Sequence, residues 1–507
     1  MTSAVRWMPA VVGAGIACFL GFWWTPHTLG ITDLDEGLYA AAARNMAISG
    51  DWVTPSVNGT PFYEKPPLSF WLAAACIKAF GPSELAVRLP SAIAATLTLG
   101  AVFAFGRRRL GPEPAFVAVC ALALAPLTVA AARLATTDAL LVLLVTCSLA
   151  AAFRARELMG CASFRWSLAA FALTGLAMLA KGAAGSLTVL AVLLAYDLIV
   201  LRRGVRSILR SVLSVKALIG LVLLLAVAAP WHVAAFRADG SIFVDEYLMR
   251  QHVARFRGGD TAHHAPVWFY VPGFVMGFFP WSLFAIAGLL REDKRRLRTE
   301  QPNTGNHGDD GDAAARIQHT LGFLRCWFVV VILLFSVSGS KLVSYILPMY
   351  PAAALLAGRW LVRACSSRHA ARKIALGAGT ALACLAAVYA VLLHPGPVVS
   401  LINRYADRQV TLDRIDADAL GLAAYLIGSV CIGLAASLVV AAIGRARWAP
   451  AVLAVTMGMF YAIVLTRGAP VAEERMIGSL HTMAREAGLL AGRDGGVHVG
   501  DPVGPVG

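Results

Sequence analysis

The sequence predicts an all-α polytopic membrane protein, and three observations lead to that fold class. Of its 507 residues, 58% are hydrophobic and only 14% are charged, and the mean hydropathy is +0.69. A soluble fold needs more polar surface than this to cover its core. Runs almost free of charge recur from end to end, among them Ala115–Ala131, Ala217–Pro230 and Ile374–Leu393. Together these features exclude a soluble enzyme, a fibrous protein and a disordered scaffold.

The chain carries a net charge of +15, which in a soluble protein would suggest a nucleic-acid partner. No stretch interleaves aromatic and basic residues as a single-strand binder does, so we expect no nucleic acid. The charge instead indicates basic loops gathered on one membrane face. The nine cysteines contain no C-x-x-C pair and lie mostly within apolar runs, so they are interpreted as packing residues.

Membrane spans need about 20 apolar residues each. The sequence predicts about thirteen, at 8–26, 86–106, 113–131, 137–153, 167–185, 186–201, 213–231, 267–290, 321–338, 343–361, 374–394, 419–442 and 449–466. The first has no cleavage site after it and is expected to stay in the protein. A further run, Pro66–Phe80, holds only about 15 residues and includes Lys78.

Loop charges decide how Pro66–Phe80 is placed. Six basic loops, which include Arg107–Arg109, Arg202–Arg210 and Arg291–Arg298, fall on one side only if this run lies along the interface instead of crossing. That arrangement predicts a cytoplasmic N-terminus and an external C-terminus. The predicted organisation is a transmembrane domain over 1–466, whose long external first loop covers about 25–88, followed by a short external tail over 467–507.

Charged residues concentrate on the predicted external face. In the first loop, Asp35 and Glu36 stand at the start of a helix-favouring stretch, where the helix dipole alone favours acids. That explanation does not cover Glu64 and Lys65, which precede two prolines where the chain re-enters the apolar layer. Charges at such a depth are costly and tend to be functional.

Later external segments add to this inventory. Asp138 begins a span, where a capping role is the simpler interpretation, and Lys181 ends one, where it can extend its amine to the interface. The segment Tyr247–Arg257 brings His252, Arg255 and Arg257 together, and Lys341 and Tyr345 follow in another corner.

This inventory indicates a chemistry. Lys65, Arg255 or Arg257, Lys341 and Tyr345 at a lipid interface suit a phosphate carried on a lipid. Carboxylates on the same face can orient sugar hydroxyls or an amine, or act as a base. No phosphate-binding loop or dinucleotide fingerprint occurs. The sequence therefore predicts a membrane enzyme that uses a lipid-phosphate-activated substrate.

Four stretches carry a family resemblance: DLDEGLYAAAARNMAISGDWVTPSVNGTPFYEKPPLSFWL, ARLATTDALL, QHVARF and SGSKLVSYILPMYPA. In this order the chain resembles the bacterial aminoarabinose (4-amino-4-deoxy-L-arabinose) lipid A transferases, which are polyprenyl-phosphate-dependent glycosyltransferases related to the protein mannosyltransferases. The resemblance covers about residues 10–360. It implies a GT-C fold with external juxtamembrane helices.

The resemblance also implies roles for individual residues. Asp35 and Asp138 match catalytic or sugar-binding carboxylates, and Lys65, Arg257 and Tyr345 match positions that hold the carrier phosphate; Arg255 and Lys341 are expected beside them. Glu36, Tyr63 and Lys181 are expected to contact the sugar or the acceptor. Glu64 and His252 match a pair that can hold a divalent metal ion, although two ligands make a sparse site.

The expected partners are an undecaprenyl-phosphate-linked sugar, lipid A or another lipid or glycan acceptor, and membrane lipids, at the periplasmic face of a bacterial inner membrane. The related transferases carry a soluble domain after the last span, whereas only Arg467–Gly507 follows here, which favours a different acceptor or a truncated chain. One alternative is transfer to a hydroxyl of a protein or glycan. Another is a lipid flippase or transporter, which the lack of paired ionisable groups near the bilayer midplane disfavours.

Overall fold

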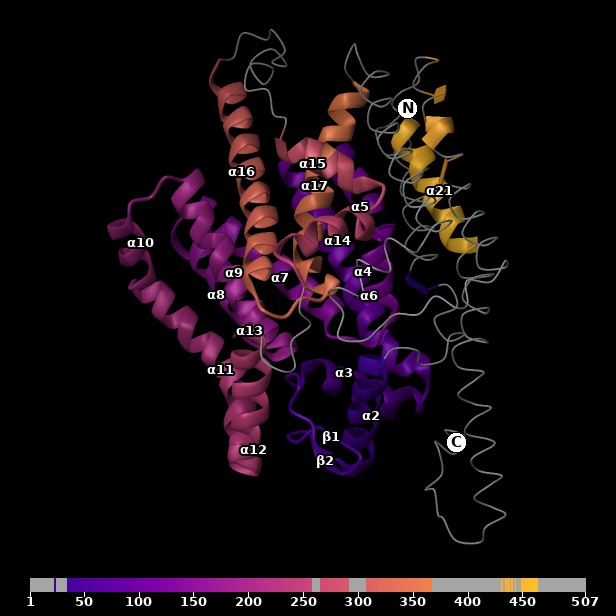
Figure 1. The fold of residues 1–507 in the computed structure, drawn as a ribbon. Helices are drawn as coiled ribbons and strands as arrows, with labels where there is room; N and C mark the ends of the chain where they lie inside the picture. Colours follow the sequence, from indigo (N-terminus) through magenta and orange to yellow (C-terminus); the bar gives the residue numbers. More distant parts are fainter. Residues whose placement is uncertain are drawn as a thin grey trace.

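The computed structural model describes residues 34–257, 265–290, 307–366 and 449–463, with isolated positions at 22–23 and within 430–448. Within these ranges the chain is almost wholly helical, and the helices run largely side by side as one bundle (Figure 1). Helices α2, α3 and α12 gather at the lower end of the bundle in this view. The predicted all-α membrane fold is confirmed.

Six described helices are long and apolar enough to cross a membrane. They are α4 (Glu84–Arg109), α7 (Asp138–Glu157), α8 (Gly160–Lys181), α9 with its continuation η2 (Ala183–Ala195 and Tyr196–Val200), α11 (Val215–Asp239) and α16 (His307–Val337). Two bent helix pairs raise the number to eight if each is one span. The predicted spans at 8–26, 374–394 and 419–442 lie outside the described helices, so the total of thirteen stays a prediction.

Prolines explain why three predicted spans are not single straight helices. Helices α5 (Pro112–Ala123) and α6 (Pro126–Arg133) meet at 62°, with Pro126 starting the second. A turn of 119° separates η4 and α14 (Val267–Phe269, Tyr270–Gly277) from α15 (Trp281–Leu290). The predicted span 343–361 becomes the 3₁₀ helix η6 (Val343–Met349) and then α17 (Tyr350–Cys365), with Pro351 in its first turn. Proline lacks the amide proton that continues a helical ladder.

The core of the bundle lies where α17 packs among α5, α15 and α16. Most of α17 is buried, and Gly358 faces the backbone of α5 so closely that a side chain there would overlap the Pro114 carbonyl. Aromatic side chains fill the neighbouring space, with the Phe153 and Phe323 rings 4.6 Å apart. The Trp327 indole donates to the Pro348 carbonyl at 2.7 Å, which satisfies a polar group that no water can reach. The last described helix is α21 (Ala449–Ile463).

Ion pairs show that the helix ends fall into two groups. At one end Arg109 of α4 pairs with Glu157 of α7, and Arg156 of α7 pairs with Asp197 of η2. We call this the basic end, and among the described residues it includes Arg109, Arg156 and Arg203 from three of the loops whose arginines the sequence places on one face. At the opposite end Arg88 of α4 pairs with Glu36, and Lys181 of α8 pairs with Asp138.

A small helical cap covers the end opposite the basic end. It consists of α2 (Leu34–Ser49), the hairpin β1–β2 (Ser56–Val57 and Thr60–Pro61) and α3 (Leu68–Phe80). Asn58 and Gly59 form the two-residue hairpin turn, and both have positive φ, as a type I′ turn requires. Tyr39 and Phe70 pack at 5.6 Å between α2 and α3. At 13 residues α3 is too short to cross a membrane, which agrees with its predicted interfacial placement.

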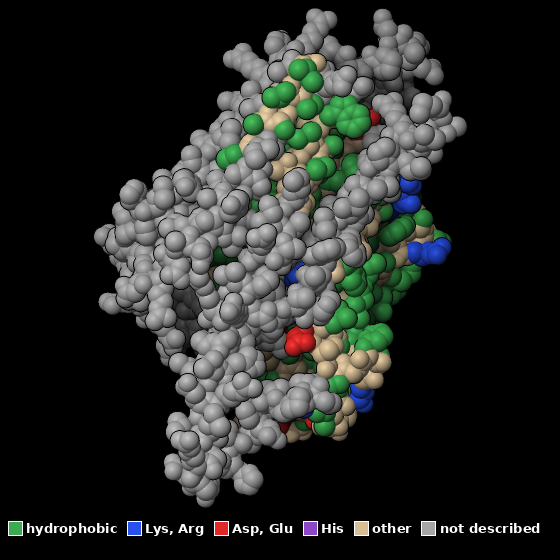
Figure 2. Space-filling view, turned by 90° about the vertical axis from the view of Figure 1, so that its right-hand side faces the viewer, with side chains coloured by type: hydrophobic (Ala, Val, Ile, Leu, Met, Phe, Trp, Pro, Cys, Tyr) green, Lys and Arg blue, Asp and Glu red, His purple; other side chains and the backbone are tan. Residues whose placement is uncertain are grey.

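The outer surface of the bundle is apolar, as expected of a multi-pass membrane protein. Leu218, Val222 and Leu225 on α11 are all exposed. Figure 2 shows another face, on which hydrophobic side chains cover much of the described surface while basic side chains lie toward its edges. An exposed apolar belt with charges at its borders is what contact with lipid tails requires.

Candidate active site

Six charged side chains from different elements converge beneath the cap. We call Asp35, Glu64, Lys65, Asp138, Lys181 and Arg255 the charged cluster. They come from α2, the β2–α3 loop, the start of α7, the end of α8, and α13 (Arg255–Arg257), which follows α12 (Ser241–Phe243) and the π-helix η3 (Val244–Ala254). Segments separated by up to about 220 residues therefore build one site.

Glu64 is the centre of one half of the charged cluster. Its Oε1 accepts a hydrogen bond from Lys65 Nζ at 2.6 Å and another from Arg255 Nη2 at 3.1 Å. All three side chains are mostly buried, so the two cations are held against one carboxylate with little water between them. The excess positive charge of this trio can attract an anion.

Burial and charge shift the pKa values of this trio. Burial alone raises the pKa of Glu64, but Lys65 and Arg255 outweigh it and hold that pKa below its ordinary value. Burial lowers the pKa of Lys65, and the nearby charges of Arg255 and Lys181 lower it further, while Glu64 opposes them. An anion bound beside Lys65 would relieve this cost of holding a buried cation.

Asp138 and Lys181 form the other half of the charged cluster. Asp138 starts α7, and Lys181 ends α8, so antiparallel packing of these neighbouring helices brings the two together as an ion pair. The Lys181 ammonium also lies 5.0 Å from the centre of the Tyr345 ring. Lys181 therefore lies between a carboxylate and an aromatic face, both of which attract its ammonium group.

Tyr39 lies where the two halves meet and was not among the predicted site residues. Burial raises the pKa of its hydroxyl, and the charges of Glu64, Asp35 and Asp138 raise it further while Arg255 opposes them. The charges of both halves therefore act on the Tyr39 hydroxyl. The sequence held a signal for it, since Tyr39 follows Asp35 by one helical turn on α2.

The corner between α16 and η6 closes another side of the site. The Ser340 amide donates to the Arg255 carbonyl at 3.1 Å, which attaches this corner to α13. Lys341 is buried in the corner and donates to the Ser338 carbonyl at 2.7 Å. Lys341 and Tyr345 thus border the charged cluster, as the sequence predicts for residues near a carrier phosphate.

Glu36 and Tyr63 both bind other groups of the protein. The Glu36 carboxylate is fully buried, takes two hydrogen bonds from Arg88 at 2.8 and 2.9 Å, and takes a third from the Ala135 amide at 2.8 Å. The Tyr63 hydroxyl is turned to Asp239 and its ring packs edge-on against Phe243. We interpret both as residues that hold the cap on the bundle. The sequence analysis did not identify Arg88 as the partner of Glu36.

His252 is fixed by the backbone of two elements. Its Nδ1 donates to the Tyr247 carbonyl at 2.6 Å, so Nε2 is unprotonated and accepts from the Ala183 amide at 3.3 Å. Burial lowers the pKa of His252, and the charges of Lys65, His232 and Arg255 act in the same direction. Gly182 makes the contact possible, because with φ of +68° any side chain there would meet the imidazole.

These contacts bear on the predicted metal pair, Glu64 and His252. Two cations bind the Oε1 atom of Glu64, and the Nε2 lone pair of His252 faces the Ala183 amide, so the two side chains do not present their ligand atoms to one shared position in this arrangement. Among the described residues, no three His, Cys, Asp or Glu side chains gather as a metal site. A metal at this position stays a prediction.

Arg257 stands apart from its neighbour Arg255. It is exposed at the end of α13, and no hydrogen bond or ion pair to it occurs within the described ranges. Arg255, one of the two arginines that the sequence offers, is therefore the one that joins the charged cluster in this structure.

Residues 64–233 match a family model described as dolichyl-phosphate-mannose-protein mannosyltransferase. This range includes Glu64, Lys65, Asp138 and Lys181. The Asp138–Lys181 half of the charged cluster therefore falls wholly within the matched region, and the Glu64 half falls partly within it.

Two similar proteins carry a more specific name. The undecaprenyl phosphate-alpha-4-amino-4-deoxy-L-arabinose arabinosyl transferase 2 of Proteus mirabilis is 30% identical over 331 residues, which cover 64% of this chain and 54% of the relative. The corresponding transferase of Pseudomonas paraeruginosa is 31% identical over 335 residues, or 65% and 55% of the two chains. The chain thus spans about half the length of these relatives.

The fold is shared with ArnT from Cupriavidus metallidurans. The apo structure of that protein aligns with a TM-score of 0.68 and 25% identity, covering 94% of this chain and 78% of the other. The structure bound to undecaprenyl phosphate aligns with a TM-score of 0.69 and 24% identity, covering 94% and 79%. The predicted GT-C architecture is confirmed by this agreement.

Proposed function

We propose that this chain is a member of the aminoarabinose transferase family of GT-C membrane glycosyltransferases and that it transfers a sugar from undecaprenyl phosphate to lipid A. The proposed sugar is 4-amino-4-deoxy-L-arabinose, the one named in its relatives. The proposed setting is a bacterial inner membrane, with the charged cluster on the periplasmic side and the basic end in the cytoplasm. This orientation follows from the positive-inside rule applied to the basic end.

One observation carries the proposal: Lys65 and Arg255 share Glu64 beneath a cap at the end of a membrane bundle. Counting Lys341 with the charged cluster, four basic groups face three carboxylates, which leaves one positive charge to attract an anion. Such a site suits a phosphate whose lipid tail stays in the membrane while its sugar extends into the cluster.

The cations stabilise the leaving group in this account. A sugar linked to polyprenyl phosphate is a phosphodiester with one negative charge, and the bond from the anomeric carbon to the phosphate oxygen breaks during transfer. A second negative charge then develops on the departing phosphate. Lys65 and Arg255 are held in place before that charge appears, which is the arrangement that lowers a transition-state barrier most effectively.

The carboxylates orient the sugar. Asp138 is bound to Lys181, so it presents the remaining acceptor sites of its carboxylate, whereas Asp35 is half-buried beside Tyr39. When the acceptor is a lipid A phosphate, its oxygen is already ionised at neutral pH and no strong base is needed. When the acceptor is a hydroxyl, a base must take its proton, and Asp35 is the candidate.

Mass spectrometry of lipid A tests the proposal. The chain is expressed in cells that make the donor but lack their own aminoarabinose transferase, beside the variants Lys65→Ala and Lys78→Ala. Lys78 is an exposed lysine on α3 and serves as the matched control. We expect an added aminoarabinose with the wild type and with Lys78→Ala, and its loss with Lys65→Ala.

Unmodified lipid A, with the protein detected in the membrane, would contradict lipid A as the acceptor. A screen of other polyprenyl-linked sugars and of hydroxyl acceptors would then separate the alternative transferase from a flippase. A transferase converts the supplied donor chemically, whereas a flippase moves it across the bilayer unchanged.

A further inference from the structure

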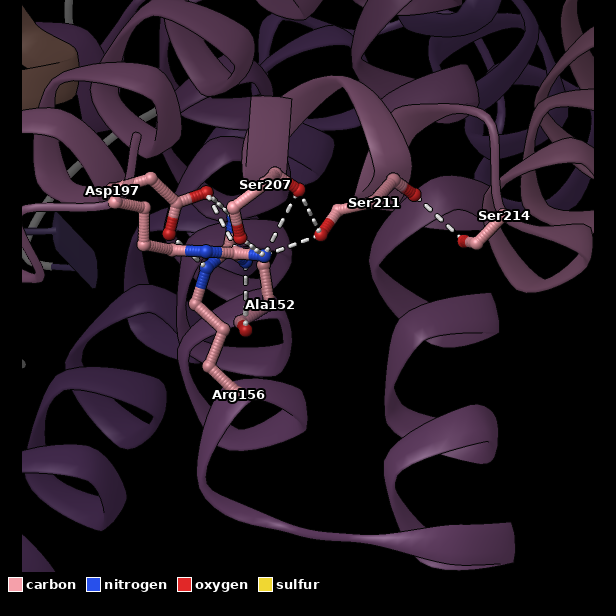
Figure 3. Close-up of polar contacts among 7 residues, drawn as sticks. Ala152, Arg156, Asp197, Ser207, Ser211 and Ser214 are labelled. Carbon is pink, nitrogen blue, oxygen red and sulfur yellow. Dashed lines mark hydrogen bonds and ion pairs between the residues drawn. The ribbon is translucent and has the colours of Figure 1, made fainter. Parts of the chain in front are cut away.

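Helix α10 (Val205–Val212) lies at the basic end, opposite the charged cluster, between η2 and α11. None of its residues is buried, so core packing does not explain why it is helical or how it is oriented. The orientation of α10 is instead explained by its polar contacts, which Figure 3 shows.

An arginine fixes one edge of α10 to the bundle. Arg156 of α7 donates two hydrogen bonds, of 3.0 and 2.9 Å, to the Asp197 carboxylate of η2. Arg203 lies 3.7 Å from the same carboxylate. The Arg203 guanidinium then donates to Ser207 Oγ at 3.3 Å and to Ser211 Oγ. Because Ser207 and Ser211 are one turn apart on the same side of α10, these bonds set the rotation of the helix.

With that edge turned inward, the other residues of α10 divide into two stripes. Val205, Leu209 and Val212 are spaced four and three residues apart and form an exposed apolar stripe. Arg206 and Arg210, also four apart, form an exposed basic stripe between the apolar stripe and the serine edge. Among the described residues, neither arginine makes a hydrogen bond or an ion pair.

The apolar stripe continues into the lipid-facing surface of the bundle. Leu213 and Val215 follow α10 and are 70% and 72% exposed, and Leu218 and Val222 carry the exposed apolar surface along α11. An apolar stripe joined to a membrane span lies at the level of the lipid tails. The arginines beside it then lie at the level of the headgroups, as in interfacial amphipathic helices.

We propose that α10 binds an anionic phospholipid of the surrounding bilayer, with Arg206 and Arg210 holding the headgroup phosphate and the apolar stripe covering an acyl chain. Charge complementarity selects this occupant, since basic residues at a membrane surface attract acidic lipids. The inference does not rest on the proposed function, because α10 and the charged cluster lie at opposite ends of the molecule.

Native mass spectrometry of the purified protein tests the proposal. The detergent-solubilised protein is given equal amounts of phosphatidylglycerol and phosphatidylcholine, and bound lipids are counted for the wild type and for Arg206→Gln/Arg210→Gln. We expect a preference for phosphatidylglycerol that falls about fivefold per arginine removed, or about 25-fold for both. Arg237→Gln, an exposed arginine near the far end of α11, is the matched control and should keep the preference.

A fluorophore on Leu209→Cys tests the position of the apolar stripe in nanodiscs. Quenching by brominated lipid and protection from aqueous iodide support the proposal. Quenching by iodide alone, or protection from both quenchers, would overturn it by placing the stripe in water or against protein. An unchanged lipid preference in Arg206→Gln/Arg210→Gln would overturn it as well.

Discussion

Asp35 discriminates between the two acceptor chemistries at the scale of a single residue. If the acceptor is a phosphate, Asp35 only orients the sugar, and Asp35→Asn should lower the rate mildly, by less than about tenfold. If the acceptor is a hydroxyl, the same change removes the base and should lower the rate by about 10²–10⁴-fold. The measurement is turnover of one donor with each type of acceptor, and equal loss with both would contradict the assignment.

His252 gives the protein a predicted pH dependence. Burial holds the pKa of folded His252 below its ordinary value, whereas the unfolded chain takes up the proton near pH 6.5. Protonation therefore favours the unfolded state: the stabilisation is complete above about pH 6.5 and declines as the pH falls toward the folded pKa. Protonated Nε2 would also point a donor at the Ala183 amide.

Thermal denaturation in detergent between pH 8 and pH 5 measures this effect. We expect the melting temperature of the wild type to decrease as the pH is lowered below about 6.5. The melting temperature of His252→Gln should decrease less over the same pH range. Tyr247, His232, Lys65 and Arg255 surround the imidazole, so His232→Gln is the control that separates the two histidines. Identical slopes in wild type and His252→Gln would rule out this residue as the cause.

Residue type and spacing were enough to predict much of the site, but not the direction of each side chain. Lys65, Asp138, Lys181 and Arg255, all among the predicted site residues, come together in the charged cluster, whereas Arg257, which the resemblance implies, stands apart. Glu36 resembles a sugar ligand in the sequence because it follows Asp35, yet on a helix neighbouring residues point about 100° apart, which turns Glu36 into the protein. Its partner Arg88 lies 52 residues away, and no local pattern reveals such a contact.

The attachment of the cap to the bundle is a property of whole elements. Glu36 of α2 connects to Arg88 of α4 and to the Ala135 amide before α7, so one carboxylate fastens three segments. Removing one partner of a buried ion pair leaves the other charge without compensation. The position of Asp35 and Tyr39 over the charged cluster depends on this attachment.

Glu36→Ala should therefore destabilise the protein by about 3–5 kcal/mol. Glu84→Ala, which removes an exposed carboxylate at the start of α4, is the control and should cost at most about 1 kcal/mol. Denaturation in detergent provides the comparison. Equal effects of the two substitutions would mean that the buried pair contributes little to holding α2 in place.

The corner between α8 and α9 forms a second junction, where Gly182 contacts η3. Gly182 has a φ of +68°, and a methyl group there would meet both the His252 ring and the Tyr247 hydroxyl. We expect Gly182→Ala to lower the melting midpoint and the activity together, because it displaces η3 and with it Arg255. Gly100→Ala on α4, where a methyl group meets open space, is the control. Full activity in Gly182→Ala would show that η3 does not need this contact.

At the scale of elements, hydropathy located the spans but not their breaks. Apolar composition marks 267–290 and 343–361 as membrane-embedded whether or not the helix is straight. The bends arise at prolines within those runs, and their angles depend on how neighbouring helices pack, which a one-dimensional pattern does not contain.

The whole molecule separates its charges into two ends with an apolar bundle between them. Loop charges alone predicted that separation, because positively charged short loops stay on the cytoplasmic side of a membrane. The convergence of the charged cluster is different in kind, since it joins residues from position 35 to position 255 that only the packed bundle brings together. The resemblance anticipated this convergence and the structure shows how the helix ends produce it.

The most direct test of the account is the rate at which purified protein releases undecaprenyl phosphate from the aminoarabinose donor with lipid A present. If Lys65 and Arg255 stabilise the departing phosphate, Lys65→Ala should lower kcat by about 10²–10³-fold, Lys65→Arg should recover part of the rate, and Lys78→Ala should match the wild type. A wild-type rate in Lys65→Ala, with its fold intact, would contradict the central claim that this charged cluster is the catalytic site.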